Sequence, residues 1–210
     1  MRTALRRGLV IAVATAGMAV PGFTTATTAA SAAPMATARP MSAPLTAAAL
    51  PSRQAWLAEV TAVTDTARQY LASRLPDRGI KAAIVLDIDN TALETRYSPR
   101  PVTPATAPVL ELARQAQEAG AVVFFVTARP QILQPWTEYN LRTVGYRWAG
   151  LYTRPTFNFD DNQELKTDAR IAIEKRGYTI VANVGNSATD LGGGHAERTF
   201  KLPDYNGQLD

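Results

Sequence analysis

The chain has 210 residues, of which 46% are hydrophobic and 19% charged, a composition that allows a packed core and argues against global disorder. Its formal net charge of +4 falls to +1 when residues 1–32, which hold three arginines and no acidic residue, are set aside, so the charge gives no support to nucleic-acid binding. The absence of cysteine excludes disulfides, thiolate metal sites and a cysteine nucleophile.

The first part of the chain has the layout of a secretory signal peptide. Residues 1–32 combine a basic start, an apolar stretch over residues 9–20 and small residues at 30–32, and both general and twin-arginine export fit this pattern. The apolar stretch is too short for a permanent membrane-spanning helix. Residues 33–50 are rich in Ala and Pro, which predicts a flexible linker. We therefore expect a secreted protein without a lasting membrane anchor and with one domain over residues 51–210.

The rest of the chain alternates predicted helices and strands. Apolar positions at helical spacing from Trp56 to Leu71 predict a helix that ends before Pro76. Strands are predicted at residues 80–89, 121–130, 148–154, 178–186 and 199–202, and further helices at 103–120, 134–145 and 162–177. This order predicts an α/β fold with a doubly wound, Rossmann-like parallel sheet and helices on both faces. Such sheets bind ligands at the carboxyl ends of their strands.

Polar side chains follow three of the predicted strands at those ends. The first strand is followed by two aspartates separated by one residue, so that both carboxylates of the extended segment point the same way. The residues concerned at the three strand ends are Asp87 and Asp89, Thr127 and Arg129, and Asn186 and Asp190. The fold predicts that these groups converge.

Asp87 and Asp89 admit two interpretations. They cap a turn, or they bind a hard cation through oxygen while one carboxylate attacks and the other transfers protons. Their mutual repulsion requires a cation or a basic group nearby, and Lys166 in the predicted helix 162–177 is a candidate. Thr127 and the backbone amides near Thr91 are candidates for holding phosphate oxygens.

Four segments resemble, in order and context, the motifs of the haloacid-dehalogenase (HAD) superfamily. They are DIDNT at 87–91, FFVTARP at 124–130, Lys166 within ELKTDAR, and VGNSATDL at 184–191. The segments LETRYSP, TEYNLRTVGYRW and RTFKLPD are similar to the secreted acid phosphatases of that superfamily, subfamily IIIB, the class that includes plant vegetative acid phosphatases. The resemblance covers about residues 52–205.

The resemblance implies a role for each matching residue. Asp87 would be the nucleophile that forms an aspartyl-phosphate, and Asp89 the general acid and later the general base, with its backbone carbonyl on Mg²⁺. Thr127 would hold the transferring phosphoryl group, Lys166 would neutralise the nucleophile and the phosphate, and Asp190 would lie in or just behind the metal shell.

The resemblance and the residue patterns together give the full set of expected site residues. The expected catalytic residues are Asp87, Asp89, Thr127 and Lys166. The expected substrate-binding residues are Thr91 and Arg129, and the expected Mg²⁺ ligands are Asp87, Asp89, Asn186 and Asp190.

The fourth motif departs from the usual Gly-Asp-x-x-x-Asp of the family. Asn186 occupies the position of the first aspartate, which is commonly a direct metal ligand. An amide oxygen coordinates Mg²⁺ but contributes no charge, so we expect the cation to be held more weakly.

The sequence therefore predicts a secreted, Mg²⁺-dependent acid phosphatase of small phosphate monoesters. One alternative is a non-catalytic phospho-ligand-binding or storage-type protein of the same fold, which Asn186 favours and the Asp87–Asp89 pair opposes. Another is a different reaction of the superfamily such as dehalogenation, which Asp89 opposes. The stretch between Thr91 and Thr103 is too short for a cap domain, so we expect an open cleft, roofed by the helix that begins near Trp56.

Other notable residues receive structural interpretations. His195, the single histidine, follows three glycines and is expected to be solvated, and Asp160 and Asp161 are expected to form a turn and a helix start. Trp136 and Tyr139 are expected to pack in the core. Ordinary structural roles also remain open for Thr127 as a strand-end residue, Lys166 as a solvated helix lysine, Arg129 as a surface arginine and Asp190 as a helix cap.

Overall fold

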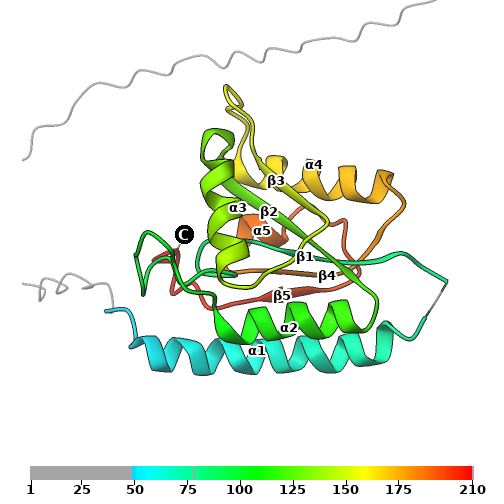
Figure 1. Ribbon diagram of the computed structural model, residues 1–210, viewed down its shortest axis with the longest axis horizontal. Helices are drawn as coiled ribbons and strands as arrows, with labels where there is room; N and C mark the ends of the chain where they lie inside the picture. Colours follow the sequence, from blue (N-terminus) through cyan, green and yellow to red (C-terminus); the bar gives the residue numbers. More distant parts are fainter. Residues whose placement is uncertain (1–48, 78, 210) are drawn as a thin grey trace, which may run out of the picture. The chain divides into compact units, whose positions relative to one another are not determined.

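The computed structural model describes residues 49–77 and 79–209 (Figure 1). The signal peptide and nearly all of the linker predicted before residue 51 lie outside this part of the chain. Among the described residues, no helix has the length and apolar character needed to cross a membrane.

The described chain alternates helices and strands as the sequence predicts. The elements are α1 (Arg53–Arg74), β1 (Ala82–Leu86), α2 (Ala107–Glu118), β2 (Val122–Pro130), the 3₁₀ turn η1 (Gln131–Leu133), α3 (Gln134–Thr143), β3 (Gly150–Arg154), α4 (Asn162–Lys175), β4 (Thr179–Gly185), α5 (Ala188–Leu191) and β5 (Thr199–Lys201). The predicted elements are all present, with ends that differ by a few residues, and η1 and α5 are additional because they are each about one turn long and carry no periodic pattern.

The five strands form one parallel sheet of order β3-β2-β1-β4-β5. β1 lies at the centre and is buried along its whole length, as a strand covered on both faces must be. The chain leaves β1 toward β2 and β3 on one side and later returns to β4 and β5 on the other. The topological switch point is therefore at the end of β1, where ligands of such sheets bind.

Helices cover both faces of the sheet, so the α/β, doubly wound prediction is confirmed (Figure 1). Successive side chains of β1 point to opposite faces. Ile84 and Leu86 pack into the core beneath α1 and α2, and Ala83 and Val85 pack with Ala169 of α4 on the other face. Among the described residues no additional folded unit is inserted after β1 or β3, which agrees with the predicted absence of a large cap.

The first helix is in a different place from the one expected. α1 begins at the cap residue Ser52, whose Oγ accepts a hydrogen bond from the Ala55 amide at 3.2 Å, and it packs on α2 at the side of the sheet (Figure 1). Its buried residues, which include Trp56, pack against α2, the sheet and the segment that holds Tyr97. The expectation that α1 roofs the cleft is therefore wrong, because its apolar face is satisfied by α2 and the sheet.

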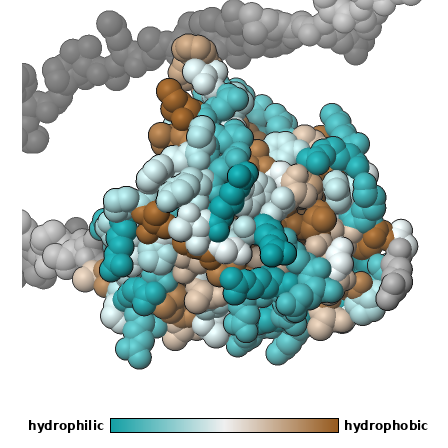
Figure 2. All heavy atoms as spheres, viewed as in Figure 1, coloured by the Kyte–Doolittle hydropathy of each residue, from teal (hydrophilic) through white to brown (hydrophobic). Residues whose placement is uncertain are grey.

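Two aromatic residues also lie elsewhere than expected. Trp136 is 50% exposed and Tyr139 is 54% exposed, and their rings stack on each other with centroids 5.4 Å apart. α3 instead buries Thr137, Asn140 and Leu141, so its inward face is partly polar. Ile132, Phe157 and Phe159 are exposed as well, and Figure 2 shows hydrophobic residues on the surface at the top of the view. The prediction that Trp136 and Tyr139 belong to the core is wrong.

Candidate active site

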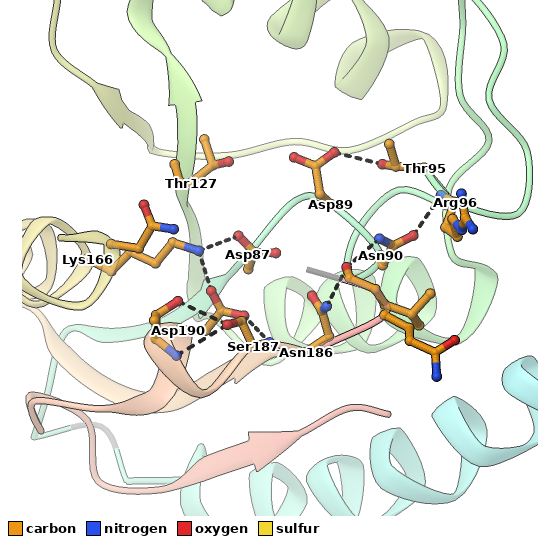
Figure 3. A pocket seen from close by; sticks show the side chains of 15 residues that line it. Asp87, Asp89, Asn90, Thr95, Arg96, Thr127, Lys166, Asn186, Ser187 and Asp190 are labelled. Atoms are coloured by element: carbon orange, nitrogen blue, oxygen red, sulfur yellow. Dashed lines mark hydrogen bonds and ion pairs between the residues drawn. The ribbon is translucent and has the colours of Figure 1, made fainter. Parts of the chain in front are cut away.

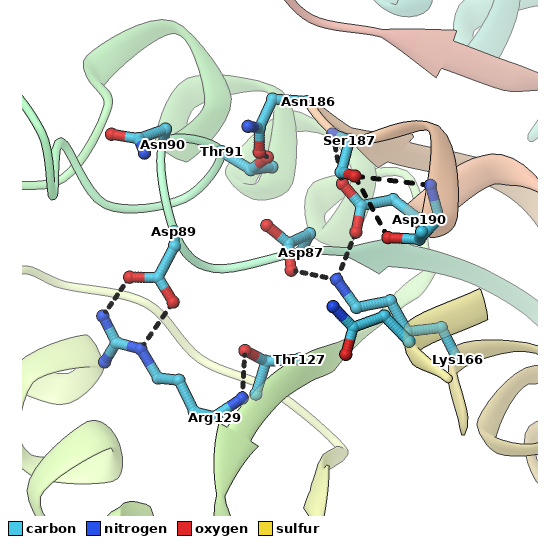
Figure 4. A network of polar contacts seen from close by, with 12 residues as sticks. Asp87, Asp89, Asn90, Thr91, Thr127, Arg129, Lys166, Asn186, Ser187 and Asp190 are labelled. Carbon is cyan, nitrogen blue, oxygen red and sulfur yellow. Dashed lines mark hydrogen bonds and ion pairs between the residues drawn. The ribbon is translucent and has the colours of Figure 1, made fainter. Parts of the chain in front are cut away.

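A pocket of about 470 Å³ opens at the carboxyl ends of β1, β2 and β4 (Figure 3). Side chains from three strand ends line it, as the fold predicts: Asp87, Asp89, Thr127, Asn186 and Asp190, together with Lys166 from α4. Arg129 and Thr91, the two expected substrate-binding residues, contact this set through Asp89 and Asn186 respectively (Figure 4). The residues singled out in the sequence therefore meet at one place.

The buried base of the pocket is an ion cluster of Asp87, Lys166 and Asp190. Lys166 Nζ donates to Asp87 Oδ1 at 3.1 Å and also bonds Asp190 Oδ1, and all three side chains are at least nine-tenths buried. Lys166 is therefore no solvated surface lysine. Burial alone lowers its pKa, but the two carboxylates outweigh burial and raise that pKa above its usual value.

The Asp87 carboxyl lies in an environment that disfavours its charge. Burial is the largest cause, the nearby Asp190 adds to it, and Lys166 opposes both, so that the pKa of Asp87 is raised to about 7. One ammonium does not fully balance these carboxylates. A further cation beside Asp87 would relieve the imbalance.

Asp89 is held differently, although it is two residues away. Arg129 grips its carboxylate with two bonds, Nε to Oδ2 at 2.8 Å and Nη2 to Oδ1 at 2.7 Å, and Thr95 Oγ1 donates to Oδ1 at 2.8 Å (Figure 4). Burial raises the pKa of Asp89, but the bonds and the charge of Arg129 outweigh it and leave that pKa below its ordinary value. The two aspartates therefore have pKa values that differ in opposite directions from normal, a pattern typical of an acid–base site.

Thr127 lies at the point where the register between β2 and β3 shifts, between Val126 and Pro130. Its hydroxyl accepts a hydrogen bond from the Arg129 amide at 3.2 Å, and the side chain points into the pocket (Figures 3 and 4). This irregular end of β2 turns Thr127 toward the pocket and Arg129 toward Asp89.

Asp190 lines the pocket from the short helix α5. Ser187 is the N-cap of α5, and Asp190 Oδ2 accepts a hydrogen bond from the Ser187 amide at 2.7 Å, which completes a capping box. A Cβ on Gly185 would come within 2.6 Å of three Asp190 side-chain atoms, so glycine is required there. Asp190 therefore combines its contact with Lys166 with a capping role.

Asn186 is 2% exposed and uses both ends of its amide. Its Oδ1 accepts from Thr91 Oγ1 at 3.0 Å, and its Nδ2 donates to the Leu209 carbonyl at 3.0 Å. A carboxylate in the same place would have no proton to donate to Leu209.

The oxygen atoms around Asp87 suit a hard divalent cation. Carboxylate, carbonyl and amide oxygens are the ligands that Mg²⁺ accepts, and the site offers Asp87, the Asp89 carbonyl and Asn186 Oδ1. Within the described residues no cluster of three His, Cys, Asp or Glu side chains is arranged as a metal site by itself. The donor set thus fits a cation that also takes backbone carbonyl, amide and water oxygens.

Several pocket residues were not found from the sequence: Asn90, Thr95, Arg96, Asn162, Ser187, Gln208 and Leu209. The most informative is Asn90, which has a left-handed backbone (φ 53°) and lies between the expected site residues Asp89 and Thr91 in the DIDNT motif. Its place inside the motif was the available signal. No sequence pattern marks residues 208 and 209. They reach the site only through the fold, since Leu209 is 119 residues away from its partner Asn90.

The remaining structural interpretations agree with the structure. Asp161 caps α4, with its Oδ1 accepting from the Glu164 amide at 2.9 Å. His195 is partly exposed and pairs with Glu174 at 2.6 Å outside the pocket lining. Neither residue belongs to the candidate active site.

The sheet order and the pocket at the strand ends define a doubly wound α/β protein with a charged pocket at its topological switch point. Residues 97–208 match the family model described as HAD superfamily, subfamily IIIB (acid phosphatase). This match covers more than half of the chain, and the chain therefore belongs to that family. The resemblance expected from the four motifs is confirmed, and the matched range includes Thr127, Lys166, Asn186 and Asp190.

Known proteins agree with this membership. The chain is 31% identical over 103 residues to vegetative storage protein 1 of Arabidopsis thaliana, a match that covers 49% of this chain and 38% of that protein. It is 27% identical over 173 residues to acid phosphatase 1 of Solanum lycopersicum, covering 70% of this chain and 66% of that one. The chain spans less than half the length of the first curated relatives that it matches.

A solved structure shares the fold. The class C acid phosphatase from Bacillus anthracis superposes with a TM-score of 0.55 at 17% identity, over 68% of this chain and 67% of that chain. At this identity the likeness concerns the fold alone.

Proposed function

We propose that this protein is a secreted, Mg²⁺-dependent phosphatase that hydrolyses small phosphate monoesters through an aspartyl-phosphate on Asp87. The observation that carries the proposal is the pairing of Asp87 with Lys166 at the end of the central strand, with Asp89 two residues further on in the same pocket. The acid phosphatase family to which the chain belongs supports it.

The proposed reaction has two steps on the chain's own residues. Asp87 Oδ2 attacks the phosphorus atom, the bond to the ester oxygen breaks, and a proton from Asp89 goes to the leaving alcohol. A water molecule then attacks the phosphorus of the aspartyl-phosphate, gives its proton to Asp89 and releases inorganic phosphate and Asp87. We assign the attack to Oδ2 because Lys166 bonds Oδ1.

The surrounding residues hold and neutralise the phosphoryl group. Lys166 offers its ammonium between the nucleophile and the phosphate, and the Thr127 hydroxyl offers a hydrogen bond to a phosphate oxygen. The amides near Thr91 have no part in this proposal, because the Thr91 and Ala92 amides each donate to a backbone carbonyl of the same turn at 3.3 Å. Arg129 orients the Asp89 carboxylate, and this pair must loosen for Asp89 to take up and give back its proton.

A bound Mg²⁺ would supply positive charge to the nucleophile and the phosphate oxygens, held by Asp87, the Asp89 carbonyl and Asn186, with Asp190 behind them. The proposal of secretion rests on the signal-peptide pattern of residues 1–32, and we propose that residues 51–210 form the domain that carries the site.

A second candidate is a storage-type or phospho-ligand-binding protein that keeps this fold without turnover. Two observations favour it: the relatives include a protein named as a vegetative storage protein, and Asn186 brings no charge to the cation site. The contact of Lys166 with Asp87, and the presence of Asp89 in the same pocket, favour the enzyme.

The test is hydrolysis of p-nitrophenyl phosphate by the purified protein over a Mg²⁺ titration. We expect metal-dependent turnover that Asp87→Asn lowers by at least about a thousandfold, because the isosteric amide is no nucleophile. Asp168→Asn is the matched control: it makes the same change of charge at an exposed position of α4 outside this pocket, and it should retain activity.

Absence of turnover at every Mg²⁺ concentration, from protein that is folded by circular dichroism, would favour the storage or binding role. Equal activity of Asp87→Asn and the parent would contradict the proposed nucleophile.

A further inference from the structure

The backbone carbonyl of Leu209 reaches the edge of the active-site pocket, 119 residues along the chain from Asn90. It accepts two side-chain hydrogen bonds there, from Asn90 Nδ2 at 2.7 Å and from Asn186 Nδ2 at 3.0 Å. Asn90 is 5%, Asn186 2% and Leu209 1% exposed. Figure 3 shows the two asparagines next to each other at one end of the pocket. One buried carbonyl thus joins the ends of β1 and β4.

Both positions need an amide. Asn90 Oδ1 accepts from the Arg96 amide at 2.7 Å, and Asn186 Oδ1 accepts from Thr91 Oγ1. Each side chain is therefore an acceptor at one end and a donor at the other, which only an amide group provides in this orientation. An aspartate at either position would place a negative oxygen against the Leu209 carbonyl and remove one of the two donors to this buried acceptor.

The segment that carries Leu209 is folded into a loop of its own, residues 202–209. It starts at the Leu202 amide, which donates to the Gly185 carbonyl at 2.8 Å, and closes where the Leu209 amide donates to the Asp204 carbonyl at 3.2 Å. Tyr205, Asn206 and Gly207 have left-handed backbones, which turn the chain back. The 202–209 loop brings Gln208 and Leu209 into the pocket lining.

We propose that Asn90 and Asn186 are positioning residues that hold the 202–209 loop as a wall of the active-site pocket, and that the asparagine at 186 provides this attachment in place of a negative charge at the cation site. The second half of this statement rests on the proposed phosphatase function and its cation. The first half concerns the loop alone.

Two effects of Asn186→Asp follow and point in opposite directions. The new carboxylate attracts a divalent cation more strongly, because it adds a charged oxygen beside Asp87. The same change removes one of the two donors to the Leu209 carbonyl and adds repulsion, so the 202–209 loop detaches more often. A residue that was a metal ligand and nothing else would show the first effect without the second.

The experiment measures amide hydrogen exchange of residues 202–209 by mass spectrometry and Mg²⁺ binding by calorimetry in the full chain. We expect exchange in the loop to be about tenfold faster in Asn186→Asp, the change that corresponds to about 1.4 kcal/mol for the loss of a buried hydrogen bond. The Mg²⁺ dissociation constant should fall several-fold in the same variant. Asn90→Asp, which leaves Asn186 intact, should also speed exchange in the loop.

Asn162→Asp is the matched control. Asn162 lines the same pocket and the substitution adds the same charge, but its side chain bonds Arg154 and not the loop. Exchange of residues 202–209 should stay within twofold of the parent.

Loop exchange that remains within twofold of the parent in both Asn186→Asp and Asn90→Asp would overturn the attachment. If Asn186→Asp does not fold, Asn90→Asp decides the same point. Faster hydrogen exchange in the loop with an unchanged Mg²⁺ dissociation constant would support the attachment of the loop. It would contradict the idea that Asn186 takes the place of a negative charge at the cation site. Because neither measurement needs turnover, failure of the proposed phosphatase activity is distinguished from failure of this inference. In active protein, we expect KM for p-nitrophenyl phosphate to rise more than kcat falls in Asn90→Asp.

Discussion

At the scale of single residues, the site is defined by how each charge is balanced. Asp89 has a bidentate arginine partner, whereas Asp87 shares one ammonium with Asp190. The same residue type, two positions apart, is therefore held ionised in one case and resists ionisation in the other. The proposed reaction needs the reverse of this resting state. An added cation would favour the ionised form of Asp87 that attacks, and loosening of the Arg129 pair would let Asp89 take up the proton that it transfers.

Lys166 is the residue whose removal should be most costly to folding. Lys166→Met would leave Asp87 and Asp190 buried without their cation, and we expect unfolding free energy to fall by about 3–5 kcal/mol, the usual cost of breaking a buried ion pair. Urea denaturation measures this change. Lys175→Met, at an exposed position of the same helix, should change stability by less than about 0.5 kcal/mol.

A loss for Lys166→Met as small as that for the Lys175 control would show that the two carboxylates are stable without their cation. In that case Lys166 would not be the main neutralising group of the pocket.

At the scale of elements, α1 supports the segment that follows DIDNT. Arg53 of α1 bonds the fully buried Glu94 with Nε at 2.5 Å and Nη2 at 2.6 Å, and Trp56 stacks on Tyr97 with ring centroids 4.7 Å apart. Between these contacts lies Thr95, the donor to Asp89. A helix outside the pocket thus fixes a segment that lines it.

Arg53→Met should therefore destabilise the protein more than its half-exposed position suggests. Glu94 would remain buried without its partner, and we expect a loss of roughly 2–3 kcal/mol of unfolding free energy. The double variant Arg53→Met, Glu94→Gln should recover most of that loss, because the amide carries no charge.

Denaturation of the two variants and the parent makes this comparison. An equal loss in the single and the double variant would mean that the buried charge of Glu94 does not cause the effect.

At the scale of the whole molecule, Asp87 makes folding stability depend on pH. The pKa of Asp87 is about 7 in the fold against an ordinary 3.8, so between these values the unfolded chain has lost a proton that the folded protein keeps. Unfolding then releases a proton and is favoured by rising pH. The contribution of Asp87 to stability is present in full below pH 3.8 and is lost as pH rises toward 7.

In the presence of a chelator, we expect this residue to lower the unfolding free energy by up to about 1.4 kcal/mol per pH unit in that window. Urea titrations at several pH values measure the slope, and Asp87→Asn, which does not titrate, isolates it. Parallel pH profiles of the parent and this variant would contradict the raised pKa.

Much of the fold was predictable because local patterns and tertiary packing agree. The apolar runs of β1, β2 and β4 are buried strands, and the alternation with helices predicts the parallel sheet and its switch point. The same logic predicted that Asp87, Thr127 and Asn186 meet, and Lys166 was a candidate because the paired aspartates need a basic group nearby. Trp136 was mistaken for a core residue because helical spacing shows that a face exists but not whether anything covers it.

The sequence by itself determined the fold class, the order of the elements and the group of residues at the strand ends, because strand and helix periodicity and parallel connections are local or nearly local properties. The tertiary structure alone decided which partner each of these residues has. Arg129 turned to Asp89, α1 packed beside α2 away from the cleft, and the Leu209 carbonyl reached Asn90 and Asn186. These contacts join segments that are tens of residues apart, and they depend on side-chain geometry and burial that no local pattern encodes.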